Sequence, residues 1–139
     1  MKGGSLMKKG FTLLELLIVV VIIGVLALIA APSLLNAADQ AKEGTVKANV
    51  SAAASSITSR FALKTSEAAT TVASTVATQL NTDNKNPFDE ANDAFSTTAV
   101  TEGTVNVAGD DTNGYITLTG YGKGGAVAIT KKVYQAPAN

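Results

Sequence analysis

The chain has 139 residues, with no cysteine, histidine or tryptophan, and 11 basic side chains against 11 acidic ones. These absences exclude a disulfide within the chain, a Cys/His zinc site, a cysteine nucleophile and the histidine that most often serves as general base. An enzyme is therefore disfavoured and no cofactor is expected. The balanced charge also argues against a strongly basic nucleic-acid-binding surface.

A short basic leader precedes a long apolar segment. Lys-Lys-Gly at 8–10 stands directly before Phe11, and an almost uninterrupted apolar run extends from Leu16 to Ala31. The run is of membrane-spanning length, yet Glu15 stands at its head. A charged residue in a membrane helix costs roughly 2.5–3.5 kcal/mol at the bilayer centre and less near the interface. The carboxylate therefore needs a partner or a role in the first helical turn.

Two ordinary explanations of this region stay open. A carboxylate in the first turn of a helix is stabilised by the positive end of the helix dipole, so Glu15 could simply cap the helix. A basic stretch before an apolar one also describes a conventional signal peptide, cleaved near Ala31. Pro32 and the internal carboxylate disfavour that second explanation. Either way, the leader lysines predict a cytoplasmic N-terminus and an exported remainder.

The junction Lys-Lys-Gly, Phe-Thr-Leu-Leu-Glu and the apolar helix after it resemble the class III signal of type IV prepilins and related pseudopilins. The resemblance covers residues 7–36. It implies cleavage between Gly10 and Phe11, methylation of the new amine of Phe11, and a leader of residues 1–10, or of four residues if Met7 is the start. It also implies that the amine of an incoming subunit pairs with Glu15 of a subunit already in the filament, which offsets two costly charges.

By this resemblance, the chain is expected to be the structural subunit of a type IV pilus used for adhesion, motility or DNA uptake. Its precursor would cross the cytoplasmic (inner) membrane once, and the mature chain would lie in an extracellular pilus on the cell surface. The implied partners are copies of itself, prepilin peptidase, the pilus assembly machinery and membrane lipid before assembly, with surfaces or DNA bound through the filament. Alternatives are a pseudopilin of a type II secretion or competence system, and a monomeric membrane-anchored binding module.

Helical spacing continues past the apolar run. The apolar positions that recur at three- and four-residue intervals are Leu34, Leu35, Ala38, Ala41, Val46, Val50, Ala53, Ile57 and Phe61. One helix is therefore predicted from Phe11 to about Leu63, with a membrane or filament-core part at 11–32 and an amphipathic part at 33–64. Its amphipathic part is expected to pack on the head of the same chain and on neighbouring subunits.

Gly24 and Pro32 are the unfavourable positions inside this helix, because glycine costs about 1 kcal/mol and interior proline about 3 kcal/mol relative to alanine. Their positions match the glycine and proline of type IV pilins. The resemblance implies a melted or kinked segment between them when subunits pack. A simple proline kink is the alternative.

Residues 65–139 predict a small globular head. Glu67 to Leu80 has helical spacing, and Asn81 to Asp93 is a loop rich in Asn and Asp, with Phe88 and Phe95 as expected core anchors. Three alternating segments predict strands at Thr104 to Ala108, Tyr115 to Thr119 and Ala126 to Tyr134.

The expected inward residues of the strands are Val105, Val107, Ile116, Leu118, Val127, Ile129 and Val133. Turn-forming residues between the strands predict a three-stranded antiparallel meander that covers the apolar stripe of the long helix. The predicted fold class is α+β and type IV pilin-like: a long N-terminal α-helix packed on a small antiparallel sheet.

Asp110, Asp111, Thr112 and Asn113 form a cluster of oxygen ligands that would suit a hard cation, and some pseudopilins bind calcium in a C-terminal loop. Their spacing is not that of an EF-hand, and adjacent acidic residues in a loop are typical of a solvated turn. No metal is therefore expected, with Asp110, Asp111 and Asn113 as weak candidates. Lys131 and Lys132 offer only a small basic surface.

Overall fold

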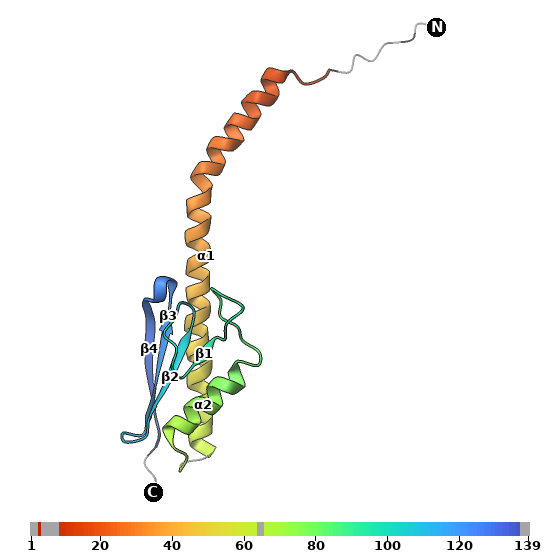
Figure 1. Cartoon of the computed structure of the whole chain (residues 1–139). Coiled ribbons are helices and arrows are strands. Elements are labelled where there is room, and N and C mark those ends of the chain that lie inside the picture. The colour runs from red at the N-terminus through yellow and green to blue at the C-terminus, as the bar shows by residue number, and fades with distance from the viewer. Residues whose placement is uncertain (1–2, 4–8, 64–65, 137–139) are drawn as a thin grey trace. The chain divides into compact units, whose positions relative to one another are not determined.

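The computed structural model describes residue 3, residues 9–63 and residues 66–136 (Figure 1). Most of the predicted leader lies outside the described residues. The chain divides into two compact units, Met1–Ala37 and Ala38–Asn139, which are described separately. The elements in chain order are α1 (Leu13–Leu63), α2 (Ala69–Leu80), β1 (Phe95–Ser96), β2 (Val105–Asp110), β3 (Tyr115–Tyr121), the short 3-10 helix η1 (Lys123–Gly125) and β4 (Val127–Tyr134).

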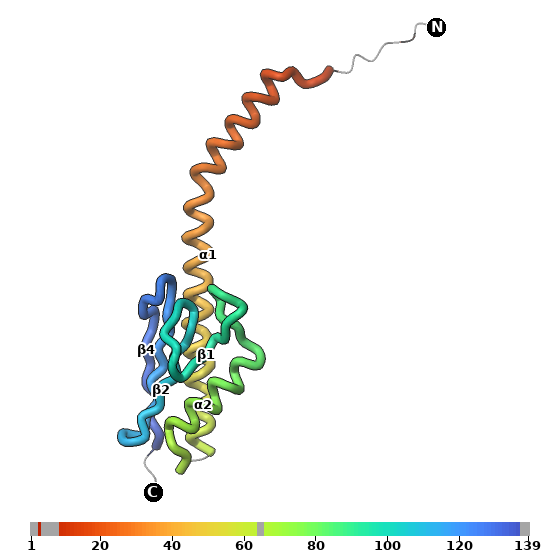
Figure 2. Tube along the Cα trace, in the orientation of Figure 1, coloured from red at the N-terminus to blue at the C-terminus, as the bar shows by residue number. Residues whose placement is uncertain are grey.

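Helix α1 confirms the long helix predicted from the sequence and runs for 51 residues. In the first unit its large apolar side chains are exposed, from Leu13 to Leu35. In the second unit one face becomes buried, and the Cα trace shows the rest of the head arranged around this part of α1 (Figure 2). The buried residues of α1 are Val46, Asn49, Val50, Ala53, Ala54, Ile57 and Phe61. Their three- and four-residue spacing is that of a helix face that packs on a core.

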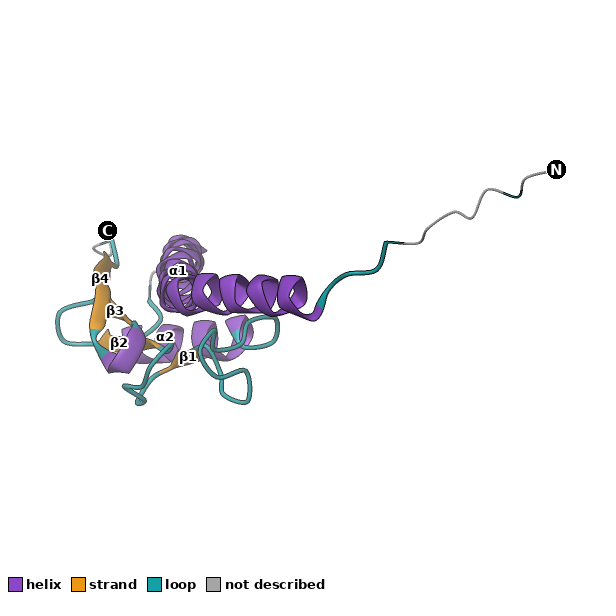
Figure 3. Ribbon diagram, turned by 90° about the horizontal axis from the view of Figure 1, so that it is seen from above, coloured by secondary structure: helices purple, strands orange, loops and turns teal. Residues whose placement is uncertain are grey.

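The sheet has the strand order β1-β2-β3-β4 (Figure 3). Strands β2, β3 and β4 pair antiparallel, which confirms the predicted meander. The sequence did not predict β1, which pairs in parallel with β2 through Phe95 and Val105. The side-chain amide of Asn81 holds β1, because its Nδ2 donates to the Phe95 carbonyl at 2.8 Å and its Oδ1 accepts from the Phe95 N–H at 2.9 Å. A two-residue strand is too short to show an alternating pattern.

Val127 is 61% exposed, so the prediction that it faces inward was wrong. The reason is an irregular register: Tyr121 pairs with Val127, and the preceding Gly120 pairs with Ile129. Two steps on β4 therefore oppose one step on β3. A bulge of this kind interrupts the alternation of side chains between the two faces of a strand. The other six predicted inward residues are buried or pack against the core.

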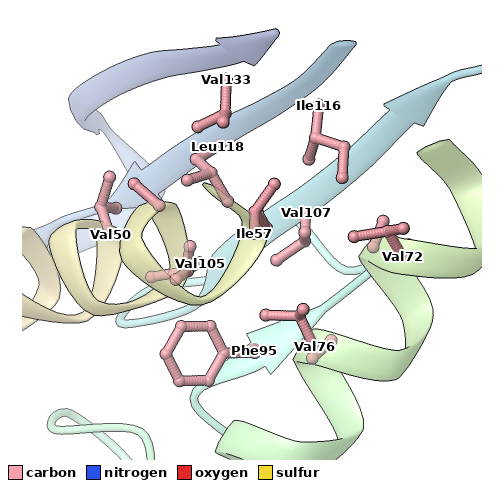
Figure 4. Packing of buried hydrophobic residues seen from close by; sticks show 14 of the residues in the cluster. Val50, Ile57, Val72, Val76, Phe95, Val105, Val107, Ile116, Leu118 and Val133 are labelled. Carbon is pink, nitrogen blue, oxygen red and sulfur yellow. The ribbon is translucent and has the colours of Figure 1, made fainter. Parts of the chain in front are cut away.

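The core lies between the head part of α1, helix α2 and the inner face of the sheet (Figure 4). Val50 and Ile57 of α1 meet strand residues such as Leu118, and Phe95 confirms its predicted role as an anchor. Helix and sheet come so close at Gly120 that an added Cβ would lie 2.8 Å from Val46 Cγ1. Glycine is required there by space. Phe88, the other predicted anchor, is partly buried against the same core.

Among the described residues, two ion pairs join α1 to the rest of the head. Near the start of the head part, the Lys123 ammonium pairs with the Asp39 carboxylate, and the Lys123 backbone N–H donates to Glu43 Oε1 at 3.4 Å. Near the end of the helix, the Arg60 guanidinium makes two hydrogen bonds of 2.9 Å to the Glu67 carboxylate. Asp39 raises the pKa of Lys123, mainly through the hydrogen bond between their side chains.

Candidate assembly site

The N-terminus of α1 is closed by a reciprocal pair of hydrogen bonds between Thr12 and Glu15. The Thr12 backbone N–H donates to Glu15 Oε2 at 2.9 Å, and the Glu15 backbone N–H donates to Thr12 Oγ1 at 3.2 Å. This is a capping box, in which Thr12 is the N-cap and Glu15 the third residue of the helix. It satisfies two of the backbone donors that every helix N-terminus leaves without a partner.

Around the capping box the surface is almost entirely apolar. A groove of about 540 Å³ lies beside Glu15 and is lined by Phe11, Glu15, Leu16, Ile18 and Val19. The Phe11 side chain is 93% exposed. The Glu15 carboxylate is thus the acidic group of a surface that otherwise suits lipid or another apolar helix.

The groove places the carboxylate next to the predicted cleavage point. Phe11 directly precedes the N-cap Thr12, so a free amine at Phe11 would carry a positive charge within about one helical turn of Glu15. The positive end of the helix dipole disfavours a cation at the N-terminus, whereas a carboxylate in the first turn stabilises one. Glu15 can therefore serve both as a cap and as the counter-charge of an amine, whether in its own chain or in another.

Comparison with known proteins identifies this segment. The family described as "Prokaryotic N-terminal methylation motif" matches residues 6–31. This chain carries the N-terminal motif of the prepilin-like proteins. The matched residues contain Gly10, Phe11 and Glu15, and the α+β architecture with a long apolar N-terminal helix is that of type IV pilins.

Two curated proteins are homologous to part of this chain. "Type IV narrow pilus major component PilA5" of Thermus thermophilus is 48% identical over 60 residues, which are 43% of this chain and 48% of that protein. "Type II secretion system core protein G" of Pseudomonas aeruginosa is 40% identical over 50 residues, or 36% of this chain and 35% of that protein. The match thus spans less than half the length of either relative. No solved structure matches the chain significantly.

Gly24 and Pro32 lie within α1, which is helical at both positions in the isolated chain. Nothing lies within 4 Å of a Cβ added at Gly24. The predicted loss of helicity concerns subunits packed in a filament, so it stays a prediction. By length and composition α1 could cross a membrane, and none of its apolar stretch is buried in the structure.

The residues of the weak metal candidate have structural roles in the head. Asp110 Oδ1 accepts the N–H groups of Thr112 and Asn113, and its Oδ2 accepts Asn113 Nδ2 at 2.8 Å. Asp111 points elsewhere: its carboxylate accepts the Thr70 N–H at 2.8 Å and the Thr70 hydroxyl at 2.7 Å, at the start of α2. Within the described ranges no three acidic, histidine or cysteine side chains gather around a common metal position.

These hydrogen bonds lower the pKa of both carboxyl groups. The pKa of Asp110 falls mainly through the side-chain bond from Asn113, and that of Asp111 mainly through the backbone N–H of Thr70. Helix α2 has no cap from its own N-cap residue, Ala68. The hairpin between β2 and β3 therefore supplies the carboxylate that caps α2 from a distant part of the sequence.

Reasoning from the sequence missed the role of Thr12. Its hydroxyl completes the capping box, yet the residue entered the sequence argument only as one letter of the motif. The signal was present, because a threonine followed three residues later by a glutamate before an apolar run is the pattern of a capping box. In the structure, Glu15 caps the helix and also lies beside the groove.

Proposed function

We propose that this chain is the structural subunit of a type IV pilus. It is cleaved between Gly10 and Phe11 by prepilin peptidase, held in the membrane by α1, and polymerised through α1 into a surface filament. The observation that carries the proposal is the capping carboxylate of Glu15, which lies in an apolar groove next to the cleavage point. The homology to a major pilus component supports it.

The apolar half of α1 is costly to leave in water. Its large side chains are exposed from Leu13 to Leu35, and they need a lipid or protein environment once the chain is made. In such an environment the Phe11 amine and the Glu15 carboxylate are each costly alone. Pairing them between two subunits offsets both costs and fixes the axial register of one helix against the next.

The test is an intact-mass and N-terminal analysis of protein sheared from the surface of the native cells. We expect abundant chain that begins at methylated Phe11. Protein recovered only from membranes, with residues 1–10 still attached or with an N-terminus near Ala31, would contradict the proposal and favour a membrane-anchored binding module or a secreted one.

A second candidate function is that of a pseudopilin, which the homology to the type II secretion core protein G favours. Processing and the role of Glu15 would be the same, so the mass alone does not separate the two. Sheared surface fractions do: a pilus subunit is abundant there, whereas a pseudopilin stays with the cell envelope and its loss stops secretion of exported proteins.

A further inference from the structure

The two edges of the head sheet carry opposite charge. Strand β4 forms one edge and contains Lys131 and Lys132 with no acidic residue. Strand β1 forms the other edge, and the loop that leads to it holds four acidic residues against one lysine, Lys85. Lys85 is already paired with Asp93 at 3.0 Å. The acidic residues of this loop are Asp83, Asp89, Glu90 and Asp93.

The acidic loop presents an ordered turn to solvent. The Asn92 backbone N–H donates to the Asp89 carbonyl at 3.0 Å, and the Asp89 carboxylate accepts the Ala91 N–H and the Asn92 side-chain amide. Glu90 lies at the tip of this turn and is exposed. No ion pair to Asp89 or Glu90 is found within residues 9–63 and 66–136. We call residues 89–92 the acidic turn.

The β4 edge borders a groove that suits such a turn. Its volume is about 510 Å³, and it lies between α1 and β4. One wall carries small and hydroxyl side chains of α1, among them Ser55 and Ser59, and the other carries Lys131 and Tyr134 of β4. Lys132 lines the same groove, and its ammonium lies 4.5 Å from the centre of the Tyr115 ring. Neither lysine has an ion-pair partner in the described part of the chain.

We propose that the β4 groove of one subunit receives the acidic turn of a neighbouring copy of this chain. This contact rests on the proposed function, since it is a second subunit interface in the same filament, formed by the heads. The carboxylates of Asp89 and Glu90 would lie against Lys131 and Lys132, and the Ser59 hydroxyl would donate a hydrogen bond to the turn.

The opposite charges of the two sheet edges determine which arrangement of two copies is favourable. A two-fold contact between two β4 edges would bring four lysines together, and one between two acidic turns would gather carboxylates. Contact between unlike edges pairs opposite charges and leaves a free acidic turn and a free groove at the two ends. A head-to-tail contact of this kind can repeat without limit, as a filament requires.

Lysines on an edge strand also have a simpler use, because they discourage pairing with other strands. The two roles predict different behaviour. A protective lysine matters only for solubility, and its replacement by glutamate is harmless because the edge strand still carries a charged side chain. A lysine in the proposed contact fails on reversal to glutamate and recovers when the partner charge is reversed as well.

The first test is cross-linking in fibres on native cells, which is clean because the chain has no cysteine. Cells would produce two copies of the full chain, one with Glu90→Cys and one with Lys132→Cys, and would be treated with a short bifunctional thiol reagent. We expect linked dimers from this pair. Lys132→Cys alone, and Lys132→Cys with Thr112→Cys, should give none; linkage of Lys132→Cys to itself would overturn the proposal.

The second test is a charge swap, read as the mass of sheared fibres. The double variant Lys131→Glu with Lys132→Glu should lower fibre yield about tenfold or more, since like charges then face each other. Adding Asp89→Lys and Glu90→Lys to the same chain should restore most of the yield. Lys131→Arg with Lys132→Arg is the control that keeps the charge and should assemble normally.

The outcomes separate this interface from the proposed function. The contact is refuted, and the pilus function stands, if the lysine-to-glutamate variant yields as much fibre as the unaltered chain. The same conclusion follows if the variant with all four charges reversed recovers no fibre although its head unfolds at the same temperature as that of the unaltered chain. If the unaltered chain forms no fibres at all, the proposed function fails, and the head contact fails with it.

Discussion

The two compact units place their apolar residues in opposite ways. In the first unit, large apolar side chains of α1 are exposed; in the second, the apolar residues at helical spacing from Val46 to Phe61 are buried. One helix therefore contains a part that its own chain covers and a part that it leaves bare. The head is therefore stabilised by packing within the chain, whereas the N-terminal part needs lipid or other subunits around it.

The largest effect is expected from Glu15→Ala, which should abolish fibres while the protein is still made and inserted. Removal of one partner from a buried ion pair leaves the other charge uncompensated and costs about 3–5 kcal/mol, or more than a hundredfold in an equilibrium constant. Sheared fibre mass and membrane content, measured on the same cells, check this. Asp83→Ala, at an exposed carboxylate of the head, should assemble normally; equal yields for both variants would contradict the role of Glu15.

A matched pair of isoleucines tests the comparison directly. Ile57→Ala should destabilise the head by about 2–5 kcal/mol, because it opens a cavity in the core. Ile18→Ala, at a side chain that is 49% exposed, should leave head stability unchanged. Denaturant unfolding of the full chain in detergent micelles measures both. A comparable loss in the two variants would show that the units do not fold by separate means.

A matched pair of glycines tests the close approach of helix and sheet. Gly120→Ala should destabilise the head by about 1–3 kcal/mol, since the new methyl group meets Val46 and Val50. Gly44→Ala, at an open position of α1, should stabilise it by about 0.5–1 kcal/mol through helix propensity. The same unfolding measurement applies, and a neutral Gly120→Ala would mean that the contact is looser than described.

The capping box should matter less than the charge of Glu15. Thr12→Ala removes the hydroxyl acceptor and should weaken the start of α1 by about 0.5–2 kcal/mol, whereas Thr12→Ser should retain it. Amide hydrogen exchange at residues 12–16 in micelles would report the difference. If exchange there is as slow in Thr12→Ala as in the unaltered chain, the hydroxyl is not needed to begin the helix.

The smallest effect is a pH dependence confined to the head. Because hydrogen bonds hold the pKa values of Asp110 and Asp111 below 3.8, their stabilisation is present above that value and is lost as the pH falls through the lower, folded values. Asp111→Asn should reduce this acid-induced loss of stability relative to the unaltered chain. Unfolding midpoints compared at neutral pH and near pH 3 check it, and identical pH profiles would contradict it.

Most of the fold could be predicted because its elements carry strong periodic patterns. The long helix, α2 and the meander all follow from spacing and turn residues. Strand β1 could not, because it is held by the side chain of Asn81 and not by a pattern of its own. The prediction that Val127 faces inward was wrong because a bulge changes the side-chain alternation. The residues of β4 alone do not reveal its register with β3.

The candidate assembly site consists of residues that the sequence singles out, and its role in assembly stays a prediction, whereas its geometry comes from the structure alone. Gly10, Phe11 and Glu15 follow from the junction between leader and helix, where a lone carboxylate meets an apolar run. That Glu15 closes a capping box with Thr12 depends on rotamers and hydrogen bonds that the spacing alone does not fix. Likewise, nothing local to Asp111 predicts that it caps α2, since the contact joins residues 41 positions apart.

The ion pair between Asp39 and Lys123 lies at the N-terminal end of the head part of α1. If a tensile load enters the head along this helix, as it would in any fibre pulled from its base, this contact is the first to bear it. A helix peeled from a sheet loses its contacts one after another, beginning at the pulled end. Because salt screens an exposed ion pair, the force needed to begin separating α1 from the sheet should fall as ionic strength rises.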